Sequence, residues 1–114
     1  MEKIYNGIVI EESLEDSRII NAFEIVDVKI TGQDDPAERW HMYTVKASKE
    51  DIHGLSRQIK GDWYAHFWEK KIVTAVFRNK IFEFDYYDKS TWKDAVEYGI
   101  SMGIAEYQLD FPID

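Results

Sequence analysis

The segment from Asp62 to Glu69 carries the residues best suited to chemistry. Because side chains alternate along a strand, Tyr64, His66 and Trp68 would share one face of an extended segment. Aromatic rings with polar tips offer a flat ligand or a protein partner a large contact area. The spacing therefore predicts a binding face. The alternative is that a second layer of the protein covers this face and that His66 is hydrogen-bonded inside.

Tyr87 is a further candidate, because the aromatic residues before it take the inward positions of the strand that ends near residue 86. An outward Tyr87 beside a helix N-terminus could contact an anionic group of a ligand. The alternative is that this ring packs over the loop. The candidate ligand- or partner-binding residues are Tyr64, His66, Trp68 and Tyr87.

A catalytic role for His66 is the first alternative, because an unperturbed imidazole titrates near pH ~6.5. With a carboxylate such as Asp62, Glu69 or Asp85 it could serve a small hydrolase or isomerase. The chain has no cysteine. The hydroxyl residues near helical segments fit better as helix caps or helix surface: Ser48, Ser90, Thr91 and Ser101. No catalytic residue is assigned.

Metal and cofactor motifs are missing from the sequence. His41, His53 and His66 show no short ligand spacing, and there is no cysteine to complete a zinc set. The six glycines are scattered and form no phosphate-binding loop. We expect neither a metal nor a cofactor.

The charge balance restricts the partners. The 114 residues include 22 acidic and 14 basic side chains, a formal charge of −8, with no basic cluster. Binding to nucleic acid or to an anionic membrane is therefore disfavoured. A basic protein surface or a small planar ligand fits better, and an acidic nucleic-acid mimic that binds a basic protein is the second alternative. The short apolar run near the start is closed by Glu11 and Glu12, which does not fit a signal peptide, so a cytoplasmic location is expected.

Six strands and two helices must position these residues. Isoleucine and valine total 21 against three leucines, which favours a sheet. Strands are expected over residues 4–11, 24–31, 40–47, 63–68, 72–77 and 80–86. Alternation in 24–31 predicts a half-buried strand, whereas 63–68 and 72–77 are apolar on both faces. Residues 12–22 fit either a short helix or an irregular turn.

Helical spacing supports two helices. One is expected over residues 49–60, with Ser48 and Asp51 as a capping box and Gly61 as the stop. The other begins near Asp88 or Ser90 and ends at Gly103. The expected fold is α+β, a single two-layer domain over residues 1–114, with a mainly antiparallel sheet of about six strands and both helices packed on one face.

Several strings in the second half resemble a family of small, uncharacterised prokaryotic proteins. They run over residues 60–68, 88–92, 97–104 and 108–111 and include WYAHFW, DKSTW, EYGISMGI and QLDF. The resemblance implies a bacterial or archaeal cytoplasmic protein of unknown function, and no site residue follows from it.

The leading hypothesis is a non-catalytic ligand- or protein-binding domain that uses an aromatic sheet surface. A homodimer formed through a sheet edge or through the aromatic face belongs to the same class.

Overall fold

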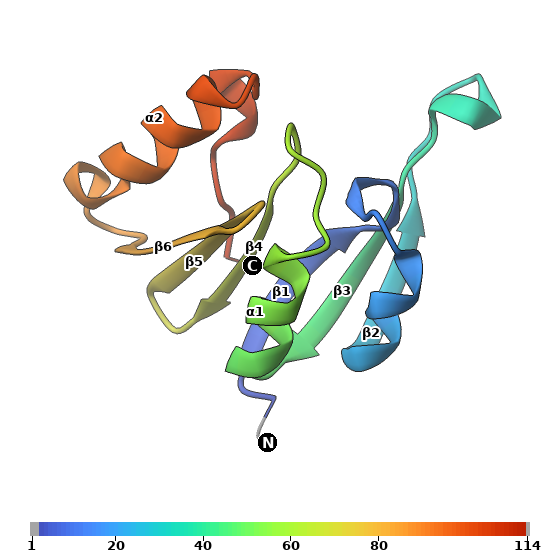
Figure 1. Cartoon of the computed structure of the whole chain (residues 1–114), viewed down its shortest axis with the longest axis horizontal. Coiled ribbons are helices and arrows are strands. Elements are labelled where there is room, and N and C mark those ends of the chain that lie inside the picture. Colours follow the sequence, from blue (N-terminus) through green and yellow to red (C-terminus); the bar gives the residue numbers. More distant parts are fainter. Residues whose placement is uncertain (1–2, 114) are drawn as a thin grey trace.

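The computed structural model describes residues 3–113, and six strands within them form one antiparallel sheet (Figure 1). In space the strands follow the order β2-β3-β1-β4-β5-β6. The α+β class and the six-stranded sheet are thereby confirmed. The strands are β1 (Tyr5–Ile10), β2 (Glu24–Ile30), β3 (His41–Ala47), β4 (Ala65–Glu69), β5 (Ile72–Phe77) and β6 (Lys80–Asp85).

The two helices, α1 (Lys49–Ser56) and α2 (Lys93–Ser101), cover opposite faces of the sheet. The consecutive β5 residues Val76 and Phe77 show this, because Val76 shares a core with Leu55 of α1 and Phe77 shares another with Ala95 of α2. Figure 1 shows β5 and β6 passing between the two helices. The prediction of two layers with both helices on one face is therefore wrong. The structure has three layers, with the sheet between the two helices.

The physical reason for the third layer lies in the central strands. Val73, Ala75, Val76 and Phe77 of β5 are fully buried, so apolar side chains leave this strand on both sides. A single helical layer would leave one set of these side chains in water, at a cost of about 25 cal/mol for each Å² of apolar surface. Each face accordingly has its own helical cover.

The capping box expected at the start of α1 is present. Asp51 N–H donates to the Ser48 hydroxyl at 3.2 Å, and Ser48 N–H donates to the Asp51 carboxylate at 2.9 Å. The helix ends at Ser56 and not at residue 60. The chain leaves the helix because Lys60 N–H donates to the Ser13 carbonyl at 2.8 Å, which ties this stretch to the chain after β1.

Residues 11–22 form two 3₁₀ segments, η1 (Glu11–Ser13) and η2 (Ser17–Ala22). Leu14 and Ile20 from this region are buried and join the core under α1. This part of the chain completes the cover that the short α1 begins on that face.

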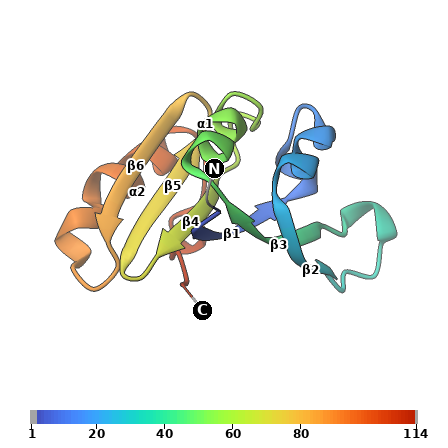
Figure 2. The ribbon, with the colours of Figure 1, turned by 90° about the horizontal axis from the view of Figure 1, so that it is seen from below.

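The expectation of a half-buried strand over residues 24–31 is wrong. All seven residues of β2 are exposed. The strand forms the end of the sheet next to β3, with a bulge between Ile25 and Asp27. Figure 2 shows it at the far end from β6 and α2. Its apolar residues Ile25, Val26, Val28 and Ile30 are all exposed.

The chain after α2 returns across the sheet as a packed extension. Gly103 ends the helix with a φ of 92°. The following segment contains η5 (Glu106–Gln108), and beyond it Leu109 and Phe111 are buried in the core of the α2 face. No helix within residues 3–113 is long and apolar enough to cross a membrane.

Candidate ligand pocket

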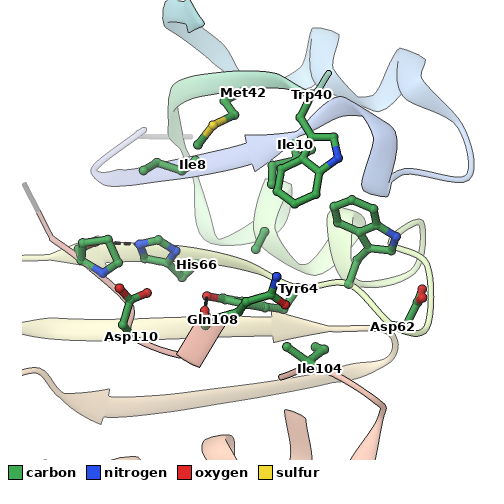
Figure 3. Close-up of a pocket in the computed structure, with 13 residues that line it drawn as sticks. Ile8, Ile10, Trp40, Met42, Asp62, Tyr64, His66, Ile104, Gln108 and Asp110 are labelled. Atoms are coloured by element: carbon green, nitrogen blue, oxygen red, sulfur yellow. Dashed lines mark hydrogen bonds between the residues drawn. The ribbon is translucent and has the colours of Figure 1, made fainter. Parts of the chain in front are cut away.

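A pocket of about 310 Å³ opens where the C-terminal segment stops covering the α2 face of the sheet (Figure 3). The extension around Phe111 covers the half of that face built by β4, β5 and β6. Within residues 3–113 the core on that face includes no residue of β1 or β3, so the surface drops from the covered half to the half built by these two strands. The lining residues are Ile8, Ile10, Trp40, Met42, Asp62, Trp63, Tyr64, Ala65, His66, Ile104, Gln108, Asp110 and Pro112.

The sheet register explains why these side chains meet. In the antiparallel pairs Ile8 lies opposite His66, and Ile10 lies opposite Met42. Residues directly opposite each other in antiparallel strands point to the same face. One wall of the pocket is therefore aliphatic and the facing wall is aromatic and polar, as Figure 3 shows.

Two tryptophans form one end of the pocket. Trp40 precedes β3 and Trp63 precedes β4, and their ring centroids lie 5.1 Å apart in an edge-to-face arrangement. Both rings are half-buried. Such an indole pair offers both a π-face and ring edges to a flat molecule.

His66 is part of the pocket wall and is also nearly buried, with 6% of its surface exposed. Its Nε2–H donates to the Pro112 carbonyl oxygen at 2.6 Å. Burial lowers the pKa of His66, and this effect outweighs the opposing influences of the Pro112 hydrogen bond and the Asp110 charge. The imidazole is therefore neutral near pH 7, with the proton on Nε2 and a lone pair on Nδ1.

Tyr64 is fixed in the same way. Its hydroxyl donates to the backbone carbonyl of Gln108, and its ring packs edge-to-face on Phe111 at 5.3 Å. Burial raises the pKa of Tyr64, and the negative charge of Asp110 adds to the shift. The phenol therefore stays protonated across the physiological range.

The charged groups of the pocket are all acidic. Asp62 and Asp110 are the charged side chains among the described lining residues, which include no lysine or arginine. Together with Nδ1 of His66 they offer acceptors to a ligand. The thirteen described lining residues also include no serine, threonine or cysteine that could act as a nucleophile.

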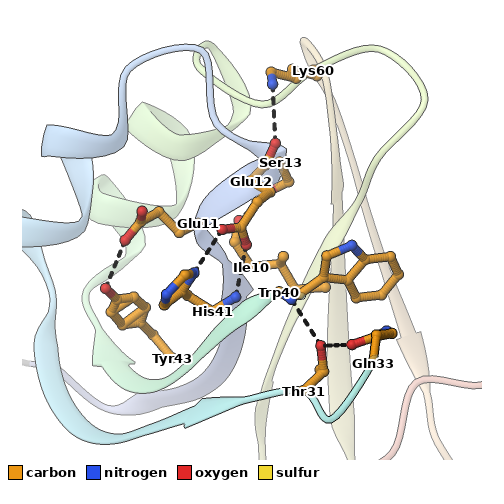
Figure 4. Close-up of polar contacts among 10 residues, drawn as sticks. All are labelled: Ile10, Glu11, Glu12, Ser13, Thr31, Gln33, Trp40, His41, Tyr43 and Lys60. Carbon is orange, nitrogen blue, oxygen red and sulfur yellow. Dashed lines mark hydrogen bonds and ion pairs between the residues drawn. The ribbon is translucent and has the colours of Figure 1, made fainter. Parts of the chain in front are cut away.

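A polar cluster next to the pocket positions Trp40 (Figure 4). The Glu12 carboxylate accepts from both the backbone N–H and Nδ1 of His41, each at 2.7 Å. Trp40 N–H donates to the Thr31 hydroxyl at 2.8 Å. These bonds tie the start of β3 to the end of β1 and to the end of β2, so the backbone that carries Trp40 is held on both sides.

The same cluster is where a metal ion would find ligands. One donor atom each from Glu11, Glu12 and His41 lies within 4.8 Å of the others. All three groups are already engaged, since Tyr43 O–H donates to Glu11 at 2.7 Å and His41 Nδ1 bonds to Glu12 at 2.7 Å. The hydrogen bond to Glu12 raises the pKa of His41 and so favours an ion pair. Glu11 and Glu12 are consecutive, but His41 lies 29 residues beyond Glu12, so the spacing gave no signal of this cluster.

The four residues singled out from the sequence do not form one site. Tyr64 and His66 line the pocket. Trp68 stacks on the far side of His66, with ring centroids 5.4 Å apart, and does not reach the lining. Tyr87 is 75% exposed in the loop between β6 and α2, where it contacts Tyr86.

The aliphatic wall and the Trp40 end of the pocket were missed by sequence reasoning. Ile8, Ile10 and Met42 belong to strands whose apolar residues read as ordinary core. Only the strand order, which places β1 between β3 and β4, brings Ile8 opposite His66 and Met42 opposite Ile10.

Comparison of the chain with protein-family models, with curated protein sequences and with solved structures gives no match in any of the three. The resemblance to small prokaryotic proteins stays a prediction.

Proposed function

We propose that this chain is a non-catalytic binding protein whose pocket takes a small, planar aromatic molecule that carries a hydrogen-bond donor or a positive charge. The main support is the lining of the pocket, whose described residues combine indole and aliphatic walls with two carboxylates and no cationic side chain. Aromatic faces attract flat rings, and carboxylates attract amine or amidine groups.

The size of the pocket agrees with this class of ligand. A volume of about 310 Å³ lies at the lower end of the range for small-molecule sites, which is ~300–1,000 Å³. A one-ring or two-ring compound fits such a space. The orientation we propose places the ring against Trp40 and Trp63 and the donor group toward Asp110.

A hydrolase or isomerase centred on His66 has less support. Its Nε2–H is held by the Pro112 carbonyl, and Asp62 lies at the opposite end of the pocket from the imidazole (Figure 3). The second alternative, an acidic nucleic-acid mimic, is supported by the net charge alone. The cytoplasmic location expected from the sequence also remains a prediction, which cell fractionation tests.

Nuclear magnetic resonance (NMR) titration with benzamidine tests the proposal. The chain has four tryptophans, and only Trp40 and Trp63 line the pocket. Their indole N–H signals should shift at millimolar benzamidine, whereas those of Trp68 and Trp92 should shift much less. Single Trp→Phe variants assign the four signals. Equal shifts of all four signals, or no shift at Trp40 and Trp63, would contradict the proposal.

A further inference from the structure

Strand β2 carries a concentration of exposed apolar side chains. Ile25, Val26, Val28 and Ile30 are each between 45% and 57% exposed. They account for four of the nine large hydrophobic residues that are exposed in the described part of the chain. Apolar residues gathered on one strand mark a contact surface more often than residues scattered singly do.

The same strand is an open edge of the sheet. Within residues 3–113 it pairs with β3 on one side, and no strand lies on its other side (Figure 2). An edge strand presents unpaired backbone N–H and C=O groups, which template the addition of another strand. Exposed apolar side chains and a free backbone edge therefore occur together on β2.

The opposite edge of the sheet differs. β6 carries exposed Lys80 and Glu83, while Phe84 is buried against the α2 core and Phe82 packs on that core. Both edges carry exposed charges, but the large apolar side chains of β2 are exposed whereas Phe82 and Phe84 of β6 pack on the core. The two edges thus differ in exposed apolar surface, and β2 is the one suited to a partner.

We propose that β2 pairs with β2 of a second copy of this chain, antiparallel and about a two-fold axis at Val28, so that the two sheets join into one. In such a pair, residues equally far before and after the axis lie opposite each other. An axis at Val28 puts Asp27 opposite Lys29, twice by symmetry, within the regular part of β2 that follows the bulge at Val26.

Neighbouring registers lack this complementarity. An axis at Asp27 sets two carboxylates against each other, and an axis at Lys29 sets two ammonium groups against each other. An axis at Val26 places Asp27 opposite Ile25. Like charges directly opposite each other destabilise a strand pair, whereas opposite charges stabilise it. Charge complementarity therefore selects both a second copy as the occupant and Val28 as the centre.

Charge reversal tests the partner. Asp27→Lys and Lys29→Asp each create two like-charge pairs in the dimer, so each should raise the dimer dissociation constant by about tenfold. The double variant Asp27→Lys with Lys29→Asp restores opposite charges and should return the constant to within a few-fold of the wild-type value. Glu83→Lys, on the other edge, is the matched control and should have no effect. Sedimentation equilibrium measures all of these constants.

Single cysteines test the register, because the chain has no other thiol. Val28→Cys places two thiols opposite each other at the axis and should give a covalent dimer under mild oxidation. Val26→Cys is the matched control, since Val26 is also exposed but lies at the bulge, away from the axis and from its own copy in the partner, and it should cross-link at least tenfold more slowly. Far-ultraviolet circular dichroism verifies that each variant is folded.

A wild-type chain that remains monomeric up to millimolar concentration would overturn the proposal. So would a dimer that Glu83→Lys weakens and Lys29→Asp does not, or faster cross-linking at position 26 than at position 28. The ligand pocket takes no part in any of these measurements, so their result is independent of the proposed function.

Discussion

The His66 imidazole donates its Nε2–H to the Pro112 carbonyl oxygen at 2.6 Å, across 46 residues of chain. This bond joins the central strand β4 to the C-terminal segment and closes one side of the pocket. The aromatic residue is thus both a structural tie and part of the pocket wall. The hydrogen bond and the burial agree with the covered-face alternative for His66, while its place in the pocket wall leaves the binding face a prediction.

The pH dependence of stability should report this bond. Burial lowers the pKa of His66 in the folded protein, whereas the unfolded chain takes up the proton near pH ~6.5. The stability from the neutral imidazole is therefore fully present above pH ~6.5 and is lost as the pH falls from there toward the folded pKa. Urea unfolding from pH 8 to pH 5 measures the slope.

His66→Phe is the control for that slope, because it keeps a planar ring and removes the titrating group. The wild type should lose stability faster than the variant as the pH is lowered below ~6.5. His41, whose pKa is raised, contributes an opposite slope to both proteins and cancels in the difference. Parallel pH profiles would show that His66 is not buried in its neutral form.

Phe111 should be the anchor of the C-terminal segment. It is fully buried and packs against Tyr64, His66, Phe84 and Trp92, and it keeps this place with an unfavourable φ of 44°. Phe111→Ala should lower the free energy of unfolding by about 3–5 kcal/mol.

The matched control is Tyr107→Ala in the same segment, because Tyr107 is 82% exposed. Its effect should stay within about 0.5 kcal/mol. Denaturant titration measures both changes. A small loss for Phe111→Ala would mean that the segment does not close the α2 face.

Gly7 and Phe67 form a cross-strand pair in which the glycine makes room for the ring. A Cβ at position 7 would lie 2.1 Å from Phe67 Cδ2, and Phe67 is fully buried. Gly7→Ala should therefore destabilise the protein by about 1–3 kcal/mol through overpacking. Gly32→Ala serves as control, since nothing lies within 4 Å of a Cβ there, and should change stability by less than about 0.5 kcal/mol. Equal effects of the two variants in thermal unfolding would refute this packing.

Glu12 should affect ligand binding from outside the pocket. Partial burial opposes ionisation of this carboxyl, but the hydrogen bonds from the backbone and ring of His41 outweigh it and lower the pKa. Glu12→Gln weakens the tie that holds the chain next to Trp40, so benzamidine affinity should fall by about threefold.

Glu38→Gln is the control for that variant, because Glu38 is an exposed carboxylate in the loop before Trp40. This substitution should leave the benzamidine affinity unchanged. Calorimetric titration with benzamidine compares the two. If both variants bind like the wild type, the Glu12 cluster does not position the indole.

Local signals in the sequence predicted most of the elements. The β-branched runs, the Ser48–Asp51 capping box and Gly103 at the end of α2 each mark structure through interactions within a few residues. The prediction that both helices lie on one face of the sheet was wrong, although the apolar residues on both faces of β4 and β5 indicated that each face is covered by another layer. Strand alternation in β2 correctly indicated a strand but not its exposure, which depends on what packs over it.

The site depends on long-range register, which a single sequence does not contain. His66 and Tyr64 stood out because they lie among aromatics in one strand. Ile8 and Met42 join them only because β1 pairs with both β3 and β4. Trp68 is adjacent in sequence to this group, yet it lies behind the imidazole.

A pocket with two carboxylates and no cationic side chain should prefer flat molecules that carry a positive charge or a hydrogen-bond donor over flat anions, and one series of isosteric probes measures this preference. Benzamidine, benzamide and benzoate share a ring and differ in charge from positive through neutral to negative. Calorimetric titration of the wild-type chain should give affinities that decrease in that order, with at least a tenfold span, and Asp110→Asn should reduce the span. Equal affinities for the three probes, or tightest binding of benzoate, would show that the carboxylates do not select the ligand.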